Sequence, residues 1–346
     1  MLVRTDLVRF LPYRGRREMY KLAFELKSQK IVLGNLPFIG ISYQGREKDM
    51  EYREKFSDKS EIKKVMKVAV DYGIRFFSAS SLGSADLSSL YLEAVKEIEE
   101  EEETNIRLIS CISIPLRLGG SKVNDYRRWR TQLTYEIEKF GSNILHKALE
   151  DPVLNCRLGW KENLQSAKPY PIIQLQRRLQ IDWKRWENSV NNFSEWEIAW
   201  IEPGSETDFL AISRSDLLGE LVDRTREAGY RCLLGSHHLG VTASLLEEVG
   251  IKRFDGYVTP INRLGVMMFP TMREVEKAVR ELRGKGKLII AIKPFAGGRI
   301  RPKEALAYVF RKMKVDACMM GVASIEEAKE DFEAARQILA DESREE

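Results

Sequence analysis

The sequence predicts an α/β fold, a (β/α)8 TIM barrel with an N-terminal extension and a largely helical insertion between strands three and four. Near the C-terminus, two short apolar runs at 288–292 and 317–322 flank apolar residues at helical spacing, the pattern of a βαβ unit in a parallel sheet. A helix that ends at glycine and leads into a strand recurs at 58–79 and 216–234. The 346 residues, 43% of them hydrophobic, suit one such barrel with additions.

The elements follow in order as short apolar runs separated by amphipathic segments. The first predicted strand, 38–43, contains Gly40, and a glycine inside a strand indicates close backbone approach or tight packing. The other predicted strands are 74–79, 106–114, 197–201, 231–236, 256–261 and the two of the C-terminal unit. The clearest predicted helices are 58–73, 85–103, 241–249, 271–283 and 325–339, with Ser57 or Asp58 and Ser324 as N-caps of the first and last.

Two segments lie outside the regular repeat. Residues 1–30 form a basic extension with a helix near 16–27, expected to pack over the bottom of a barrel that spans 31–342. About eighty residues separate strand three from strand four, where a plain crossover needs one helix and two loops. Residues 172–193 are expected to be that helix. Residues 117–171, with a helix at 128–146, are expected to be an insertion over the C-terminal mouth, as a lid or a protein-partner surface.

The composition of the chain narrows the functional class of protein that it can encode. The net charge is +4 although 31% of residues are charged, so no global field indicates nucleic-acid or membrane binding. YRRWR at 126–130 and WKRW at 183–186 interleave basic and aromatic residues, but helical spacing places Trp183 and Trp186 on one face, typical of a core. Four cysteines without CxxC spacing argue for a reducing compartment and against a metal centre. No run of 18 apolar residues occurs, and we expect a cytoplasmic protein.

Residues at strand ends are the candidates for chemistry, because barrel active sites form there. They are Ser78, Ser80, Cys111, Ser113, Glu202, Ser236, His237, His238, Asn262, Lys293 and Ser324. Glu202, His237 and Lys293 are the candidates for general acid–base catalysis at the mouth, which would also hold a small-molecule ligand. The alternative is that Glu202 and Lys293 form only an ion pair at the rim.

The segments IAIKPFAGG, EALAYVF and GVASIEEAKEDFEAA resemble the seventh and eighth βα units of the aldo-keto reductase superfamily, particularly its branch with a Met-Lys-Pro-like motif after strand seven. That family is a (β/α)8 barrel that transfers hydride between NAD(H) or NADP(H) and a carbonyl. The resemblance implies that Ser236 and His237 contact the nicotinamide of the cofactor. It implies pyrophosphate contacts from Phe295, Ala296, Gly297 and Gly298. It implies contacts at the adenosine end from Ser324, Glu327, Glu330 and Asp331. Glu327 stands where a basic residue usually holds the 2′-phosphate, which favours NAD over NADP.

The same resemblance places other residues at the family's four catalytic positions. Ser78 stands at its Asp, Gly83 at its Tyr, Cys111 at its Lys and Glu202 at its His. Two hypotheses follow. The protein is a nicotinamide-dependent oxidoreductase whose proton donor has been rebuilt, or it is a non-catalytic barrel, a pseudoenzyme that keeps the fold and uses its insertion as a binding or scaffold surface. Binding of no cofactor at all is a separate alternative to NAD or NADP.

Overall fold

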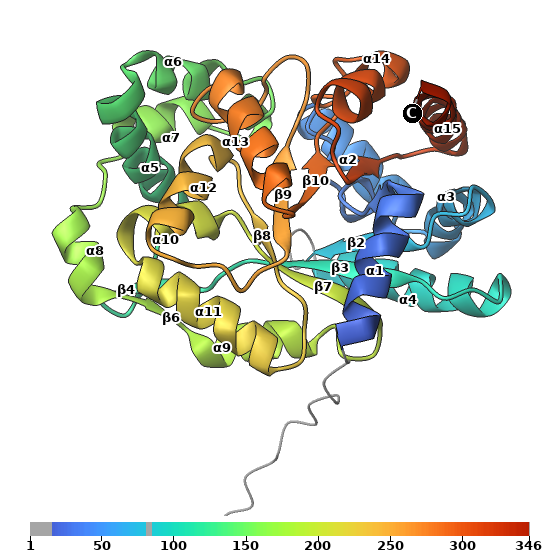
Figure 1. The fold of residues 1–346 in the computed structure, drawn as a ribbon, viewed down its shortest axis with the longest axis horizontal. Coiled ribbons are helices and arrows are strands. Elements are labelled where there is room, and N and C mark those ends of the chain that lie inside the picture. The colour runs from blue at the N-terminus through green and yellow to red at the C-terminus, as the bar shows by residue number, and fades with distance from the viewer. Residues whose placement is uncertain (1–15, 81–84, 346) are drawn as a thin grey trace, which may run out of the picture.

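Eight parallel strands form the barrel that the sequence predicts (Figure 1). The computed structural model describes residues 16–80 and 85–345. The strands are β1 (Ile31–Gly34), β2 (Phe76–Ser80), β3 (Arg107–Ile112), β7 (Glu197–Pro203), β8 (Leu233–Gly235), β9 (Gly256–Pro260), β10 (Leu288–Ile292) and β11 (Ala317–Gly321). They pair in the order β7-β3-β2-β1-β11-β10-β9-β8. A parallel bridge between Ile201 and Cys232 joins the two ends of this order, so the sheet closes on itself.

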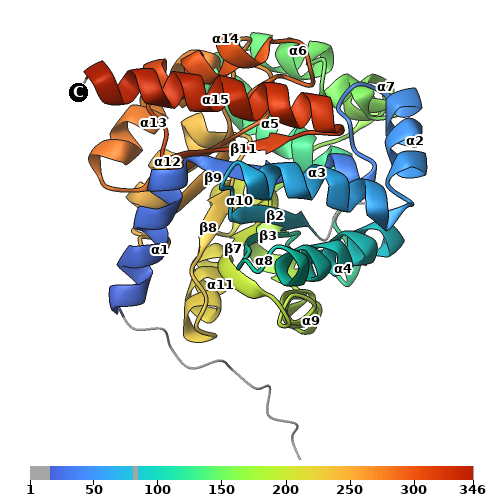
Figure 2. The same ribbon diagram turned by 90° about the vertical axis from the view of Figure 1, so that its right-hand side faces the viewer.

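Helices surround the barrel and connect successive strands (Figure 2). They are α2 (Arg46–Lys55), α3 (Lys59–Asp71), α4 (Ala85–Glu101), α10 (Glu206–Ser213), α11 (Ser215–Glu227), α12 (Leu239–Glu248), α13 (Met272–Gly284), α14 (Pro302–Leu306), its π-helical continuation Ala307–Lys312, and α15 (Ile325–Glu345). Helix starts follow capping rules: Asp58 accepts from the Ser60 N–H, and Thr271 from the Glu274 N–H. Among the described residues, no helix is long and apolar enough to cross a membrane.

The first strand is not where the sequence analysis placed it. Residues 38–43 were expected to form it, but β1 is the four-residue run Ile31–Gly34, which pairs with β11 and β2. Phe38 and Ile39 instead belong to a 3-10 turn, Pro37–Ile39, and Gly40 after it takes a left-handed conformation with φ of 79°. Pro37 has no N–H for a ladder and Gly40 turns the chain, so this stretch forms a loop at the mouth.

The barrel interior is filled by one layered apolar cluster. It contains inward-facing residues of the strands, among them Phe76, Trp200 and Ile290. Leu22 and Leu26 of α1 (Arg16–Gln29) belong to the same cluster. Glu25 pairs with Arg107 at the start of β3, and Lys27 with Asp316 just before β11. Helix α1 therefore covers the N-terminal end of the barrel, opposite the carboxyl ends of the strands.

The insertion between β3 and β7 is a helical unit with its own small sheet. It comprises β4 (Leu116–Leu118), β5 (Ser121–Lys122), α5 (Asp125–Phe140), α6 (Asn143–Glu150), the 3-10 turn Leu154–Cys156, α7 (Trp160–Ser166), α8 (Ile172–Arg178), β6 (Leu179–Ile181) and α9 (Trp183–Asn191). Helices α5 to α8 lie together on the left of Figure 1, away from α2, α3 and α4. A single apolar cluster joins α5, α6 and α7 to residues that follow β9 and β10, such as Phe269 and Ile300, whereas Leu175 of α8 belongs to the main core.

Two predicted helices of this region are divided. The one expected at 128–146 is two helices, because Gly141 adopts φ of 90° between α5 and α6. The crossover helix expected at 172–193 is interrupted by β6, which pairs antiparallel with β4, Leu116 facing Ile181. Trp186 is buried and Trp183 packs partly buried against the main core, as their helical spacing predicts.

Candidate functional site

A cavity of about 590 Å³ opens at the carboxyl ends of the strands. It is lined by residues on or just after every barrel strand and by Asp125, Arg128 and Arg157 from the insertion. Of the sequence-predicted residues, Glu202, Ser236, His237, Lys293, Phe295, Gly297, Gly298, Glu327, Glu330 and Asp331 line it. Ala296 is fully buried beneath its loop, and Ser324 lies at the start of α15 outside the cavity lining. The structure thus brings together the candidate acid–base residues and most of the candidate ligand residues.

Glu202 lies at the centre of this mouth. It sits near the end of β7, level with Cys111 on β3 and, one strand further, with Ser80 on β2. The carboxyl group is buried, and the Cys111 thiol hydrogen-bonds to it. A Cβ added at Gly235 would lie 2.6 Å from Glu202 Oε1, so the glycine leaves room for the carboxyl group. Burial raises the pKa of Glu202 to about 8, although the thiol and the ammonium of Lys293 act to lower it.

Lys293 and His237 form the second part of the mouth. Lys293 Nζ lies 3.4 Å from His237 Nε2 and 5.0 Å from the centre of the Tyr43 ring. Lys293 itself has φ of 55°, which turns the chain sharply where β10 ends. Burial, and then the nearby Lys293 charge, hold the pKa of His237 well below its usual value. His237 is therefore neutral at pH 7, and its Nδ1 is buried without a partner among the described residues.

The His237 loop is held by Asp208, which the sequence analysis missed. This buried carboxylate on α10 accepts from Ser236 Oγ at 2.6 Å, from the His237 and His238 N–H groups, and from Thr242 Oγ1 at 2.7 Å. Four donors satisfy the carboxylate and fix the turn between β8 and α12. No sequence motif marks Asp208, since its partners come from 28 to 34 residues away.

The insertion reaches the same loop through a second buried pair. His238 Nδ1 lies 2.8 Å from Glu136 Oε1 of α5, and both side chains are almost completely buried. The Trp129 ring, also on α5, stacks on His237 at 6.0 Å between ring centres. A polar link and an aromatic contact therefore tie the insertion to the candidate site. Sequence analysis did not find Glu136, because 102 residues separate it from His238.

Four residues stand at the catalytic positions that the resemblance implies, and the structure describes three of them. Ser78 on β2 bonds to Asn35: it accepts from the Asn35 N–H and donates to Asn35 Oδ1. Gly83 lies outside the described residues. Cys111 and Glu202 are the hydrogen-bonded pair described above. Burial and the nearby Glu202 raise the pKa of the Cys111 thiol well above its usual value, so this thiol is neutral.

Two charged regions border the rest of the cavity. At the glycine loop after β10, Arg299 Nη1 donates to the carbonyls of Ala296 and Gly297, and to that of Tyr43 across the cleft. At the start of α15, Glu327, Glu330 and Asp331 line the opposite end. Burial, with the charges of Glu327 and Glu330, raises the pKa of Asp331 to about 8. The cavity is therefore basic at the loop and acidic beside α15.

Comparison with known proteins gives only distant similarities. No protein-family model matches the chain, and no curated protein matches its sequence. Similar solved structures include a "Putative aldo-keto reductase from Pseudomona aeruginosa", with a TM-score of 0.46 and 14% identity over 90% of both chains. Another is a homocysteine methyltransferase from Escherichia coli in metallated form, with a TM-score of 0.43 and 11% identity over 91% of this chain and 98% of that one. The first is of the superfamily that the C-terminal motifs resemble.

Proposed function

We propose that this barrel is a nicotinamide-dependent reductase in which Glu202 donates the proton to a carbonyl substrate. The observation that carries the proposal is the burial of Glu202 in the cavity wall, with a pKa of about 8. A carboxyl group with that pKa keeps its proton at neutral pH, which a proton donor requires. The pKa also lies close to the working pH, where proton transfer is most effective.

The neighbours of Glu202 suit the state of the site after proton transfer. Once the proton has left, a carboxylate remains in a buried site and needs stabilisation. The Cys111 thiol donates a hydrogen bond to it and the Lys293 ammonium supplies opposite charge; both favour the charged form. His237, neutral and 3.4 Å from Lys293 Nζ, holds that ammonium at the mouth. Glu202 then recovers its proton from solvent.

The cavity also has the charges that a dinucleotide needs. Arg299 and the glycine loop at Gly297 and Gly298 would hold the pyrophosphate, and Glu330 and Asp331 would accept hydrogen bonds from the adenosine ribose. The bound nucleotide would supply the hydride. Glu327 repels a 2′-phosphate, so NAD(H) is favoured over NADP(H).

The test is to follow NADH and NADPH oxidation with a panel of small aldehydes and ketones, for the wild type and for Glu202→Gln. A positioned acid contributes roughly 10²–10⁴-fold, and we expect the variant to lose about that much. Glu248→Gln, on α12 and outside the cavity lining, is the matched control and should keep full activity. Turnover that survives in Glu202→Gln would refute the assigned role. NADH binding without any turnover would support the non-catalytic hypothesis instead.

A further inference from the structure

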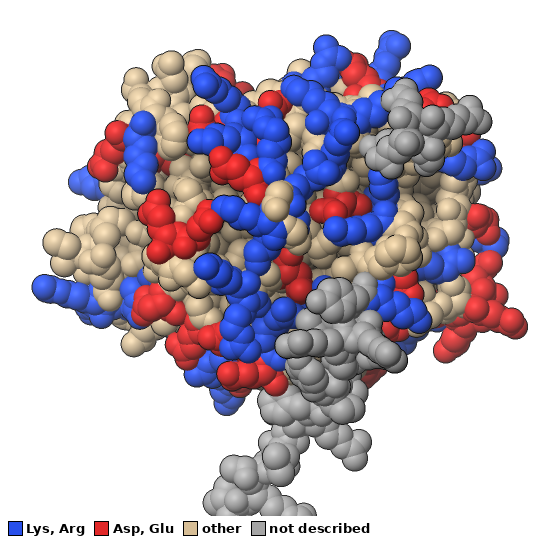
Figure 3. Space-filling model, viewed as in Figure 1, with Lys and Arg blue, Asp and Glu red and all other residues tan. Residues whose placement is uncertain are grey.

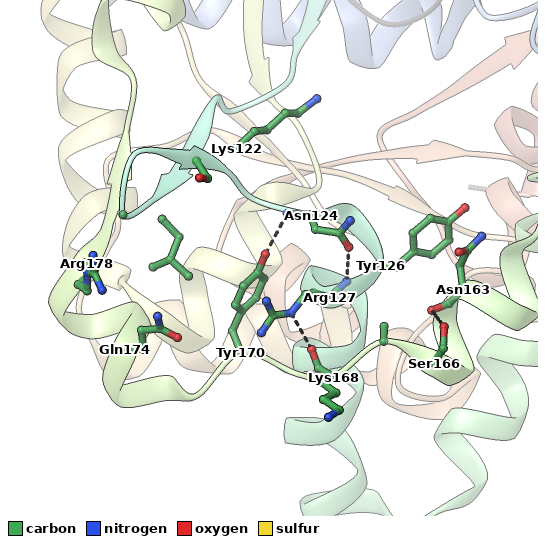
Figure 4. Close-up of a pocket in the computed structure, with 14 residues that line it drawn as sticks. Lys122, Asn124, Tyr126, Arg127, Asn163, Ser166, Lys168, Tyr170, Gln174 and Arg178 are labelled. Atoms are coloured by element: carbon green, nitrogen blue, oxygen red, sulfur yellow. Dashed lines mark hydrogen bonds between the residues drawn. The ribbon is translucent and has the colours of Figure 1, made fainter.

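The insertion carries a second cavity, separate from the barrel mouth. It is an open groove of about 790 Å³ formed by the β4–β5 hairpin, the first turn of α5, the end of α7 and helix α8 (Figure 4). All its lining residues lie between 118 and 178, so the insertion builds it alone. The candidate reductase site does not use this groove.

The charged residues in the groove are all basic. Lys122, Arg127, Lys168 and Arg178 line it, and no Asp or Glu does. Lys168 and Arg178 are exposed and form no ion pair within the described part of the chain. The neighbouring acid, Asp125, is engaged elsewhere: it pairs with Arg128 and Arg157, which line the barrel mouth. Four positive charges thus face one concave surface, which raises the local concentration of anions.

One of these cations is held in place. The Arg127 guanidinium lies over the Tyr170 ring, 3.9 Å from its centre, and its Nε donates to the Lys168 carbonyl at 2.9 Å. The Tyr170 hydroxyl in turn accepts from the Asn124 N–H at 3.0 Å, next to the hairpin. The two Nη groups of Arg127 have no partner among the described residues. A guanidinium fixed in this way loses little side-chain entropy when it binds an oxyanion.

We infer that this groove binds a small ligand that carries two or more phosphate groups. Clustered Arg and Lys side chains with no acidic residue in the groove lining match closely spaced phosphates, which accept several charge-assisted hydrogen bonds at once. A single-stranded nucleic acid fits less well, because it needs open aromatic faces for its bases. Tyr170 is buried beneath Arg127, and Tyr126 packs on Trp160 at 5.7 Å between ring centres. On the face shown in Figure 3, basic side chains run down the middle with acidic side chains among them.

Calorimetric titration of the full chain with inorganic tripolyphosphate tests the inference. We expect binding that weakens with added salt, and about 10-fold weaker binding in Lys168→Gln and in Arg178→Gln, since a hydrogen bond to a charged group contributes about that much. Arg177→Gln is the matched control: Arg177 neighbours Arg178 on α8, is exposed and lies outside the groove lining. Thermal melts of all three variants establish that they fold like the wild type.

Three results would overturn the inference. The first is that tripolyphosphate does not bind the wild type. The second is that Arg178→Gln and Arg177→Gln bind tripolyphosphate equally well, which would place the ligand outside the groove. The third is a different choice of anion. This would be seen if citrate bound as tightly as tripolyphosphate, or if a single-stranded oligoribonucleotide bound more tightly than tripolyphosphate and lost affinity in Arg178→Gln.

Discussion

Cys111 and Glu202 occupy paired positions on adjacent parallel strands, and the thiol donates a hydrogen bond to the carboxyl group inside the barrel mouth. Both groups are neutral at pH 7, because burial raises the pKa of each. In the resemblance that the C-terminal motifs carry, these two residues stand at the Lys and His positions of the family. Under the proposed function, proton donation by Glu202 would depend on how strongly its buried site disfavours the carboxylate.

The first prediction concerns pH. The proposed reaction requires the protonated form of Glu202, so its rate should be constant below neutrality and fall as pH rises through about 8. Rates measured from pH 6 to 10 at saturating substrate check this. A rate that instead rose through this range would mean that the carboxylate, acting as a base, is the active form.

The second prediction concerns Cys111. Its thiol stabilises the carboxylate of Glu202, so Cys111→Ala should raise the pKa of Glu202 further and move the alkaline fall in rate to higher pH. Cys111→Ser keeps a donor and should leave the profile nearer that of the wild type. A downward shift in the alanine variant would contradict the contact.

The third prediction uses two glycines. A Cβ at Gly235 would lie 2.6 Å from Glu202 Oε1 and 2.9 Å from the Pro203 carbonyl oxygen, so Gly235→Ala should lower the free energy of unfolding by about 1–3 kcal/mol. Gly284, at the end of α13, has nothing within 4 Å of such an atom, and Gly284→Ala should be neutral or slightly stabilising. Urea unfolding of both variants compares them. Equal effects would show that the space beside Glu202 is not restricted.

The fourth prediction concerns Asp208. In Asp208→Asn, the four groups that donate hydrogen bonds to the carboxylate lose a charged acceptor. The NH2 group of the new amide is itself a donor and faces these donors. We expect a loss of about 1.5–3 kcal/mol in unfolding free energy. Asp223→Asn removes a half-exposed carboxylate from α11 and should change stability by less than about 0.5 kcal/mol. Thermal or urea unfolding distinguishes the two, and a mild effect at Asp208 would mean that the loop is held by packing.

The fifth prediction concerns nucleotide choice. If the dinucleotide lies as proposed, Glu327→Gln and Glu330→Gln each remove a negative charge near the adenosine ribose. NADPH should then bind more tightly while NADH changes little. Glu326→Gln, on the same turn of α15 but outside the cavity lining, is the control. Fluorescence quenching gives both affinities, and tighter NADPH binding to the wild type would contradict the preference.

The sequence predicts features that depend on neighbouring residues better than features that depend on residues far apart in the chain. The strand at 288–292 and the candidate Glu202 are predictable, since each depends on a local apolar run and its end. The β1 strand is not, because its four residues give a weaker signal than the longer segment 38–43, which contains Phe38, Ile39, Ile41 and Tyr43. Strand β6 is missed since its partner β4 lies about sixty residues earlier. The burial that raises the pKa of Glu202 depends on neighbours from other strands, and the Glu136–His238 pair depends on how the insertion folds back; local patterns encode neither.

Helix α1 determines from which side ligands would enter the barrel. With Leu22 and Leu26 at the N-terminal end and packed side chains through the interior, the cavity opens at the carboxyl ends of the strands. Under the proposed function, the nucleotide and the carbonyl substrate would both enter from that side. The molecule that binds deeper would then have to bind first and leave last, so helix α1 would favour an ordered mechanism.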